Sequence, residues 1–190
     1  MAVRMKILTP TENLTLTDRK AFVEAAIRLG IARALKRGLA GSENELVIRH
    51  LRCLADLGTA IEGWFTAPLL VANTPYSVFQ AIGAVGVGVA VPNNNVFVFY
   101  KAGVQTPGVP MPVSLLNFAQ GAAGGTTYAQ FDLEQFANQL IPEGYFSEPV
   151  VYEPGEVMLI TATARVATLL PAAVQLGCLV IEPKGPVISG

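Results

Sequence analysis

The sequence predicts a mainly β protein, in which a jelly-roll-like β-sandwich follows an N-terminal helical hairpin. From residue 59 onward, short apolar segments with strand-like alternation are separated by proline- and glycine-containing turns. Such a pattern is typical of a sandwich or jelly roll rather than of a βαβ sheet. Before residue 59, apolar residues recur at three- and four-residue spacing, which indicates amphipathic helices. We therefore divide the 190 residues into a basic helical hairpin, residues 1–58, and a β-sandwich domain, residues 59–190.

The hairpin is predicted to contain two helices, over residues 17–38 and 42–57. The first is followed by glycines that favour a helix end, and the second begins at Ser42-Glu43-Asn44-Glu45, a capping-box sequence. Two helices alone leave much of each apolar stripe open to water, so the hairpin needs a third surface. We expect that surface to be one end of the sandwich, and we favour the sandwich of a neighbouring subunit.

The β region is predicted to start with a long strand over Tyr76–Val91, where valines alternate with glycine and alanine. Pro92–Asn95 is expected to turn the chain into a returning strand over Val96–Tyr100, which would complete a hairpin. Gly86 and Gly88 would allow another backbone to approach this strand closely. After this hairpin we expect a short helical crossover at Asp132–Leu140. Three more strands are expected, at Val150–Tyr152, Glu156–Leu169 and Ala172–Ile181.

Charge is distributed unevenly along the chain. Residues 1–58 contain ten Lys and Arg against six acids, a net charge of +4, whereas residues 59–190 contain three against eight, a net charge of −5. Basic side chains in number can neutralise phosphates, so the first helix is a candidate for contact with nucleic acid or a partner protein. A solvated helix face is the simpler explanation of the same charges. The candidate contact residues are Arg19, Lys20, Arg28, Arg33, Lys36 and Arg37.

No motif for catalysis, cofactor binding or metal binding is present in the sequence. The single histidine, His50, has no Glu-x-x-His or His-x-x-x-His partner, and Cys53 and Cys178 have no C-x-x-C spacing. The segment Gly83–Gly88 does not lead from a strand into a helix, as a dinucleotide loop must. A hydrolase built on two carboxylates remains an alternative, but nothing selects the pair among Asp132, Glu134, Glu143, Glu148, Glu153 and Glu156. We therefore predict no enzyme, no cofactor, no metal and no small-molecule substrate.

A membrane is not the expected partner. A spanning helix needs about 20 consecutive apolar residues. The longest uncharged stretch, Gly63–Tyr100, is interrupted by prolines and asparagines. The first ten residues also lack the apolar segment of a signal peptide. We expect a protein made in the cytoplasm, where its cysteines stay reduced.

The low charge of residues 59–190 indicates assembly. Eleven charges on 132 residues leave a surface made largely of small and uncharged side chains. Charge keeps protein surfaces apart, so a monomer of this kind tends to associate. We expect much of the surface to be buried against identical or related structural subunits.

A family resemblance points the same way. In Val150–Thr161, Pro154-Gly155-Glu156 precedes an alternating strand. This resembles the entry to a strand in β-sandwich virion proteins of tailed and icosahedral bacteriophages. The low charge, the proline-containing loops and the Pro/Gly-rich tail are similar to such proteins too, and the resemblance covers roughly residues 59–190. It implies a capsid, minor capsid or decoration protein, with no catalytic residues to carry over.

The sequence thus predicts a structural protein of the virion, which self-assembles or binds neighbouring subunits in a phage capsid or head–tail structure. Packaged nucleic acid is a further partner of the basic helices. The alternative is a soluble β-sandwich module that binds a ligand or receptor through the rim loops 103–112 and 117–127. Trp64, Phe65 and Tyr76 would be its candidate sugar platform, although core anchors are the simpler role for them. A third hypothesis is a membrane-active protein that uses Tyr76–Val91.

Overall fold

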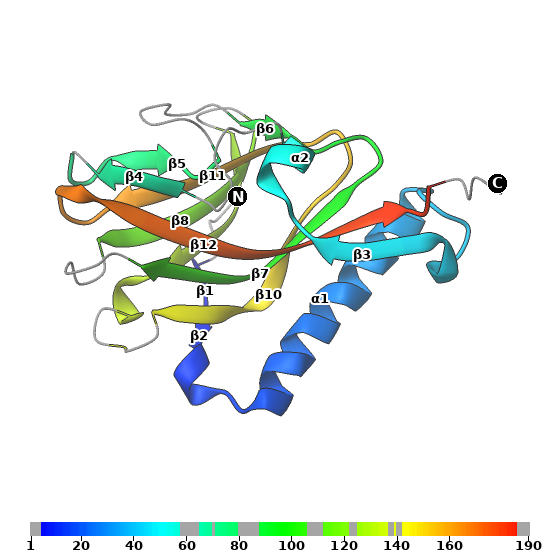
Figure 1. The fold of residues 1–190 in the computed structure, drawn as a ribbon, viewed down its shortest axis with the longest axis horizontal. Helices are drawn as coiled ribbons and strands as arrows, with labels where there is room; N and C mark the ends of the chain where they lie inside the picture. Colours follow the sequence, from blue (N-terminus) through cyan, green and yellow to red (C-terminus); the bar gives the residue numbers. More distant parts are fainter. Residues whose placement is uncertain are drawn as a thin grey trace.

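Two β-sheets packed face to face, with a long helix beside them, form the described part of the chain (Figure 1). The computed structural model describes residues 5–57, 65–69, 71–79, 88–105, 112–121, 125–136, 139 and 142–185. The prediction of a mainly β protein with two sheets is confirmed.

Each sheet collects strands from distant parts of the sequence. Sheet A has the order β1-β9-β8-β11-β5, and β6 also pairs with β11; sheet B has the order β2-β10-β7-β12-β3, and β4 also pairs with β12. Neighbouring strands are antiparallel, except that β1 runs parallel to β9. The strands of sheet A are β1 (Met5–Lys6), β5 (Pro75–Ser77), β6 (Val89–Ala90), β8 (Val113–Gln120), β9 (Thr126–Asp132) and β11 (Val157–Ala164). Those of sheet B are β2 (Leu8–Pro10), β3 (Leu46–His50), β4 (Phe65–Leu69), β7 (Val96–Gln105), β10 (Glu143–Tyr152) and β12 (Thr168–Pro183).

Aromatic side chains fill the space between the two sheets. Phe99 of sheet B contacts Phe118 of sheet A with ring centroids 5.4 Å apart, and Phe131 of sheet A stacks on Phe146 of sheet B at 4.0 Å. All four rings are fully buried in one continuous core. Ring pairs of this kind add about 0.5–1.5 kcal/mol each beyond their area burial, so they hold the sheets together.

The first predicted helix is confirmed as α1 (Leu16–Lys36). It begins at a capping box, in which the Thr15 hydroxyl accepts a hydrogen bond from the Asp18 amide and the Asp18 carboxylate accepts one from the Thr15 amide. The hydrogen bonds from Thr15 also hold the pKa of Asp18 below its usual value. The cap satisfies amide groups that would otherwise lack partners at the first turn.

Helix α1 packs on the outer face of its own sheet B, so the preference for a neighbouring subunit is wrong. Strand β7 explains the arrangement, because its successive side chains point to opposite faces. Val96 and Val98 belong to the core under α1, whereas Phe97 and Phe99 belong to the core between the sheets. Strand β7 is therefore apolar on both faces.

Gly30 sets how closely α1 approaches the sheet. A Cβ atom at this position would overlap the Cδ1 atom of Ile181 on β12 and lie 2.8 Å from a methyl group of Val98. Ala26 and Ala34, about one helical turn on either side, are fully buried on the same stripe. Small residues along this stripe let the helix backbone lie almost directly on the sheet.

The second predicted helix, residues 42–57, is wrong for most of its length. Glu43–Glu45 form a short 3-10 turn, Leu46–His50 form strand β3, and only Cys53–Leu57 are α-helical, as α2. The Ser42 side chain caps nothing, and the Glu45 carboxylate accepts instead from the Gly41 amide at 2.8 Å. A strand wins because β12 offers a ladder of backbone partners and the space beneath α1 accepts the buried Leu46 side chain. The predicted helical hairpin is thus one helix and one strand.

The predicted β-hairpin before residue 100 is also wrong. Strand β6 pairs with β11 in sheet A, whereas β7 lies between β10 and β12 in sheet B, so the turn after β6 leads from one sheet to the other. The close approach at Gly88 is confirmed, since a Cβ there would lie 2.9 Å from the carbonyl oxygen of Gly121. Gly86 lies outside the described residues.

The remaining expectations differ mainly in their bounds. Strands β11 and β12 match two of the predicted strands, and the predicted strand Val150–Tyr152 is the end of the longer β10. Within Asp132–Leu140, a 3-10 turn covers Glu134–Phe136. Strands from both sides of residue 58 lie in sheet A and in sheet B.

Candidate functional site

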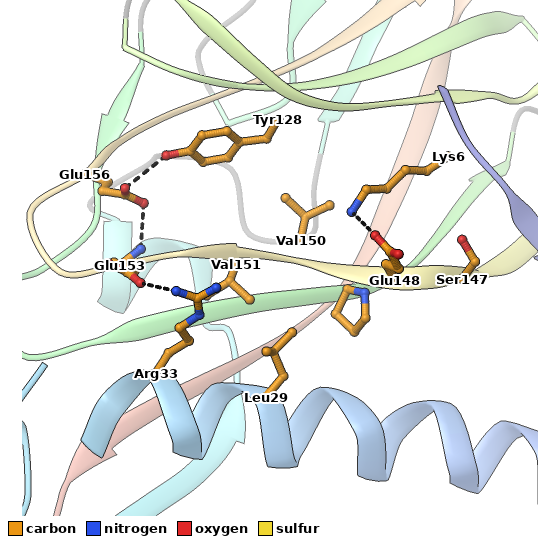
Figure 2. A pocket seen from close by; sticks show the side chains of 11 residues that line it. Lys6, Leu29, Arg33, Tyr128, Ser147, Glu148, Val150, Val151, Glu153 and Glu156 are labelled. Carbon is orange, nitrogen blue, oxygen red and sulfur yellow. Dashed lines mark hydrogen bonds and ion pairs between the residues drawn. The ribbon is translucent and has the colours of Figure 1, made fainter. Parts of the chain in front are cut away.

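A groove of about 580 Å³ lies between α1 and strand β10 (Figure 2). Its size is within the usual range of ligand pockets, about 300–1,000 Å³. It receives Leu29 and Arg33 from α1, Lys6 from β1, Tyr128 from β9, residues 147–151 from β10, and Glu153 and Glu156 from the turn after β10. Five of its eleven lining residues are charged, which makes the groove a candidate site for a polar ligand.

An irregularity in β10 shapes one wall of the groove. Tyr145 pairs with Lys101 of β7, but the next paired residue, Val150, faces Phe99. Residues 146–149 of β10 therefore lie opposite Tyr100 alone, which makes a wide bulge. Pro149 has no amide hydrogen to continue the ladder. Bulges commonly redirect side chains beside functional sites, and here the bulge brings Ser147 and Glu148 to the groove.

The exposed carboxylate of Glu148 pairs with the chain's first strand. Its Oε2 atom lies 3.1 Å from the Nζ atom of Lys6 (Figure 2). The Ser147 amide donates to the carbonyl oxygen of Ile7 at 3.0 Å, so the same bulge is held by backbone and side chain. Ion pairs at exposed carboxylates contribute little stability, about 0–1 kcal/mol. The pair therefore adds little stability, although it links β10 to β1 at the rim of the groove.

The turn after β10 carries two carboxylates in defined positions. Glu156 accepts hydrogen bonds from the Tyr128 hydroxyl at 3.0 Å, from the Gln120 amide at 3.2 Å and from the Glu153 backbone amide at 2.7 Å. Gly155 supports the turn with a φ of 76°, which favours glycine. Burial, together with the neighbouring Glu156 carboxylate, raises the pKa of Tyr128. The phenol therefore stays protonated and acts as a donor.

Glu153 connects the turn to the C-terminal end of α1. Its carboxylate lies 3.2 Å from Nη1 of Arg33 and also binds the guanidinium of Arg37. Glu153 is mostly buried, with 13% of its side chain exposed, whereas both arginines are about half exposed. Cations also suit the last turn of a helix, where the backbone dipole is negative. The result is a clamp that ties the C-terminal end of α1 to the turn between β10 and β11.

The three carboxylates at the groove are each engaged by other parts of the chain. A general acid or base must exchange a proton directly with a substrate. Glu148, Glu153 and Glu156 each hold a partner from another strand or helix, as described above. Among the residues that the structure describes, no cluster of three or more His, Cys, Asp and Glu could hold a metal ion.

The other acids named from the sequence lie elsewhere. Glu143 pairs with Lys101 at 2.9 Å, Glu134 lies 3.8 Å from Arg165, and the Asp132 carboxylate accepts the Glu134 amide. The structure therefore gathers three of the six acids at the groove and leaves three apart.

The six basic residues predicted to form a contact surface divide into two groups. Arg33 and Arg37 bind Glu153, and Arg19 is half-buried with its Nη2 atom donating to the Thr11 carbonyl at 2.9 Å. Buried acceptors of the chain itself therefore hold these three side chains, although the Arg37 side chain is still about half exposed. The other three are exposed, and they are Lys20, Arg28 and Lys36.

The remaining residues singled out in the sequence have plain structural roles where they are described. His50 is exposed on β3, and Cys178 is buried in the core between the sheets. Tyr76 is buried, and its hydroxyl accepts from the Val71 amide at 3.0 Å. The side chains of Cys53 and Phe65, all of Trp64, and parts of the loops 103–112 and 117–127 lie outside the described residues.

A second polar cluster joins β3 to its neighbours. The Arg49 guanidinium binds the Asp56 carboxylate at 2.6 and 2.8 Å and the Glu182 carboxylate at 2.8 Å. These hydrogen bonds raise the pKa of Arg49. Burial acts to raise the pKa of Asp56, but the bonds from Arg49 and from the Arg52 amide outweigh it and hold that pKa below its usual value. The cluster fixes α2 and β12 to β3.

No family model matches the chain, and no curated protein matches it. In the described ranges, no helix is both long and apolar enough to cross a membrane.

Proposed function

We propose that this protein is a structural subunit of a virion, which self-assembles or binds neighbouring subunits in a phage capsid or head–tail structure. In this proposal its two packed sheets are a β-sandwich of the jelly-roll type. The observation that carries it is the absence of charge from most of sheet A.

Four of the six strands of sheet A contain no Asp, Glu, Lys, Arg or His. They are β5, β6, β8 and β11, which are contiguous through their pairing with β11. Charge on this sheet is confined to Lys6 and Asp132. Most residues of these strands are buried, and those that reach solvent, such as Leu115, Asn117 and Val157, carry no charge. Monomeric proteins use surface charge to resist association, so uncharged residues at the solvent-facing positions support a role in which copies pack together.

Exposed apolar side chains lie at one end of the same sheet. Val71 is 58% exposed and Val166 is 40% exposed, in the turns that flank β5 and β11. The two turns are joined directly, because the Asn73 amide donates to the Ala164 carbonyl at 2.7 Å. In this proposal Val71 and Val166 are part of a subunit contact at this end of the sheet.

Helix α1 supports a further part of the proposal. Its apolar stripe is already buried on sheet B, so the helix does not need a neighbour in order to be covered. Its exposed cations Lys20, Arg28 and Lys36 stay available for packaged nucleic acid.

The test is the size of the purified protein, measured by size-exclusion chromatography with light scattering over a range of concentrations. We expect a defined large oligomer, and we expect the Val71→Lys/Val166→Lys double variant to shift toward smaller species. A matched control, Thr17→Lys/Ala25→Lys, adds the same charge at exposed positions of α1 and should leave the oligomer intact. A wild-type protein that stays monomeric at tens of micromolar contradicts the proposal.

The groove beside α1 favours one second candidate, a module that binds a soluble ligand or receptor. Its mixed charges suit a polar ligand such as a glycan. This alternative requires a monomer that gives reproducible glycan-array hits, and Arg33→Ala should abolish them while the fold persists. Assembly without such hits favours the structural role.

A further inference from the structure

Strand β3 forms an open edge of sheet B. It pairs with β12 on one side, and no described strand lies on its other side. Val47 and Ile48 are consecutive residues on opposite faces of this strand, with 36% and 37% of their surfaces exposed. An edge strand with exposed apolar side chains is a ready template for pairing with another strand.

The hydrogen bonds to β12 show which backbone groups point outward. The Leu51 amide donates to the Cys178 carbonyl at 3.1 Å, and the Lys184 amide donates to the Glu45 carbonyl at 2.7 Å. In an antiparallel pair such bonds recur at every second residue, so the odd-numbered residues of β3 face β12. The backbone groups of Ile48, at the centre of the strand, therefore face away from the sheet.

The other described edge strands carry devices that discourage pairing. Strands β1 and β6 have two residues each. Strands β2, β4 and β5 each include a proline, at positions 10, 68 and 75, and proline cannot donate to a ladder. Strand β3 has five residues and no proline. Of the described edges, it is the one suited to a backbone ladder.

The charges around β3 select the partner and its direction. Glu43 and Glu45 are exposed just before the strand. Arg52 follows its end, with its side chain 64% exposed and 3.7 Å from the Asp56 carboxylate. Two copies of β3 in antiparallel orientation place the acidic start of each beside the basic end of the other. A parallel pair would instead bring like charges together. Arg49 does not oppose the contact, because Asp56 and Glu182 bind its guanidinium.

We infer that β3 pairs antiparallel with β3 of a second copy, about a two-fold axis at Ile48. In this register Ile48 faces Ile48, Val47 faces Arg49, and Leu46 faces His50. The two Ile48 residues exchange backbone hydrogen bonds, and each His50 amide donates to the Leu46 carbonyl of the other copy. The contact joins the B sheets of two copies into one continuous sheet. This inference rests on the proposed function, since it names one contact of the assembly.

Cysteine cross-linking tests the register directly. At a hydrogen-bonded antiparallel pair the two Cα atoms lie about 5.5 Å apart, which a disulfide can span. Ile48→Cys, in a Cys53→Ser background, should therefore give covalent dimers upon mild oxidation. Val47→Cys is the matched control, because it lies on the same strand with nearly the same exposure. Its nearest symmetry mate is a diagonal neighbour about 7–8 Å away, beyond the reach of a disulfide.

We expect at least a tenfold higher yield of covalent dimer from Ile48→Cys than from Val47→Cys, with circular dichroism confirming that both variants fold. Equal yields, or no dimer from Ile48→Cys, overturn the inference. Ile48→Lys provides a second measurement, because two lysines facing each other should reduce the β3 contact at least tenfold in a dilution series.

Light scattering on the wild-type protein separates the two proposals. A large oligomer that persists in Ile48→Lys, with no disulfide in Ile48→Cys, overturns the β3 contact and leaves the structural role standing. A dimer that cross-links through residue 48 and never grows larger supports the contact and contradicts the larger assembly. A wild-type monomer contradicts both.

Discussion

Substitution of Gly30 by alanine tests how closely α1 lies on sheet B. Helix propensity alone predicts that Gly30→Ala stabilises the protein by about 1 kcal/mol, because glycine is a poor helix former. The structure predicts the opposite. The new Cβ would overlap Cδ1 of Ile181 and lie 2.8 Å from Cγ2 of Val98, and both of these side chains are fully buried.

Inserting a methyl group into a packed core costs about 1–3 kcal/mol. Neither blocking atom can move into solvent, so we expect the packing cost to exceed the propensity gain. The net loss should be about 1 kcal/mol of unfolding free energy. For a chain of this length, that corresponds to a fall of about 2–4 °C in Tm.

The assay is thermal and urea unfolding of the wild type, Gly30→Ala, Ile181→Val and the double variant. Ile181→Val removes the Cδ1 atom that the new methyl group would overlap, at a cost of about 0.5–1.5 kcal/mol by itself. In the double variant the penalty of Gly30→Ala should shrink or reverse, which gives a favourable coupling energy. Ala25→Gly, at an exposed position of α1, calibrates the propensity effect alone. A rise in Tm for Gly30→Ala in the wild-type background would refute the close approach.

Three further predictions concern other contacts. Glu153→Gln should destabilise the protein by about 1 kcal/mol, because two half-exposed arginines lose their carboxylate partner. Salt screens such exposed charges, so this loss of unfolding free energy should shrink at high salt. A loss that does not change with salt would contradict the clamp. Asp56→Asn should lose about 1.5–3 kcal/mol at pH 7 through its charged hydrogen bonds to Arg49. The folded pKa of Asp56 is lowered, so its contribution to stability is present above the usual carboxyl pKa and disappears as the pH falls through the folded value. The unfolding free energies of wild type and variant should therefore converge in acid. A difference in unfolding free energy that stays constant with pH would contradict this prediction. Gly88→Val should lose at least about 1–3 kcal/mol because a backbone oxygen blocks its Cβ, whereas Gly185→Val, with nothing within 4 Å of the new atom, should have no effect.

Local patterns in the sequence identify the elements whose surroundings are also local. The three- and four-residue spacing predicts α1 to within two residues at each end, because a helix makes its backbone hydrogen bonds within itself. Residues 42–57 fit a helical pattern equally well. Strand β3 forms there because β12, more than a hundred residues away, supplies its hydrogen-bond partners.

Local patterns do not show distant strand partners, and this also explains the error at Val96–Tyr100. The apolar run correctly predicts a strand, but a hairpin assigns it the nearest partner in sequence. Its actual neighbours are β10 and β12, which can lie beside it because it is apolar on both faces. Continuous burial, unlike simple alternation, indicates a central strand covered on both sides.

The groove could not be predicted from sequence, because its residues come from distant segments. Arg33 and Glu153 are 120 positions apart, and Lys6 reaches Glu148 from the first strand. One signal was present in the sequence. Arg33 and Arg37 are four residues apart and so share a helix face, where a single carboxylate can bind both. The sequence does not say that the partner is Glu153.

The division of the basic residues limits what α1 can do with nucleic acid. Arg33 and Arg37 bind Glu153 and Arg19 is half-buried, so Lys20, Arg28 and Lys36 are the exposed candidates among the six. Three phosphate contacts per copy would give a salt dependence of about −2.7 in log K against log salt, which is shallow for a dedicated nucleic-acid binder. Contact with a packaged genome would then depend on many copies acting together in an assembly, where each contact raises the effective concentration of the next. On this reasoning, the isolated protein should bind nucleic acid weakly, and disruption of the β3 contact should weaken that binding further without any change in α1.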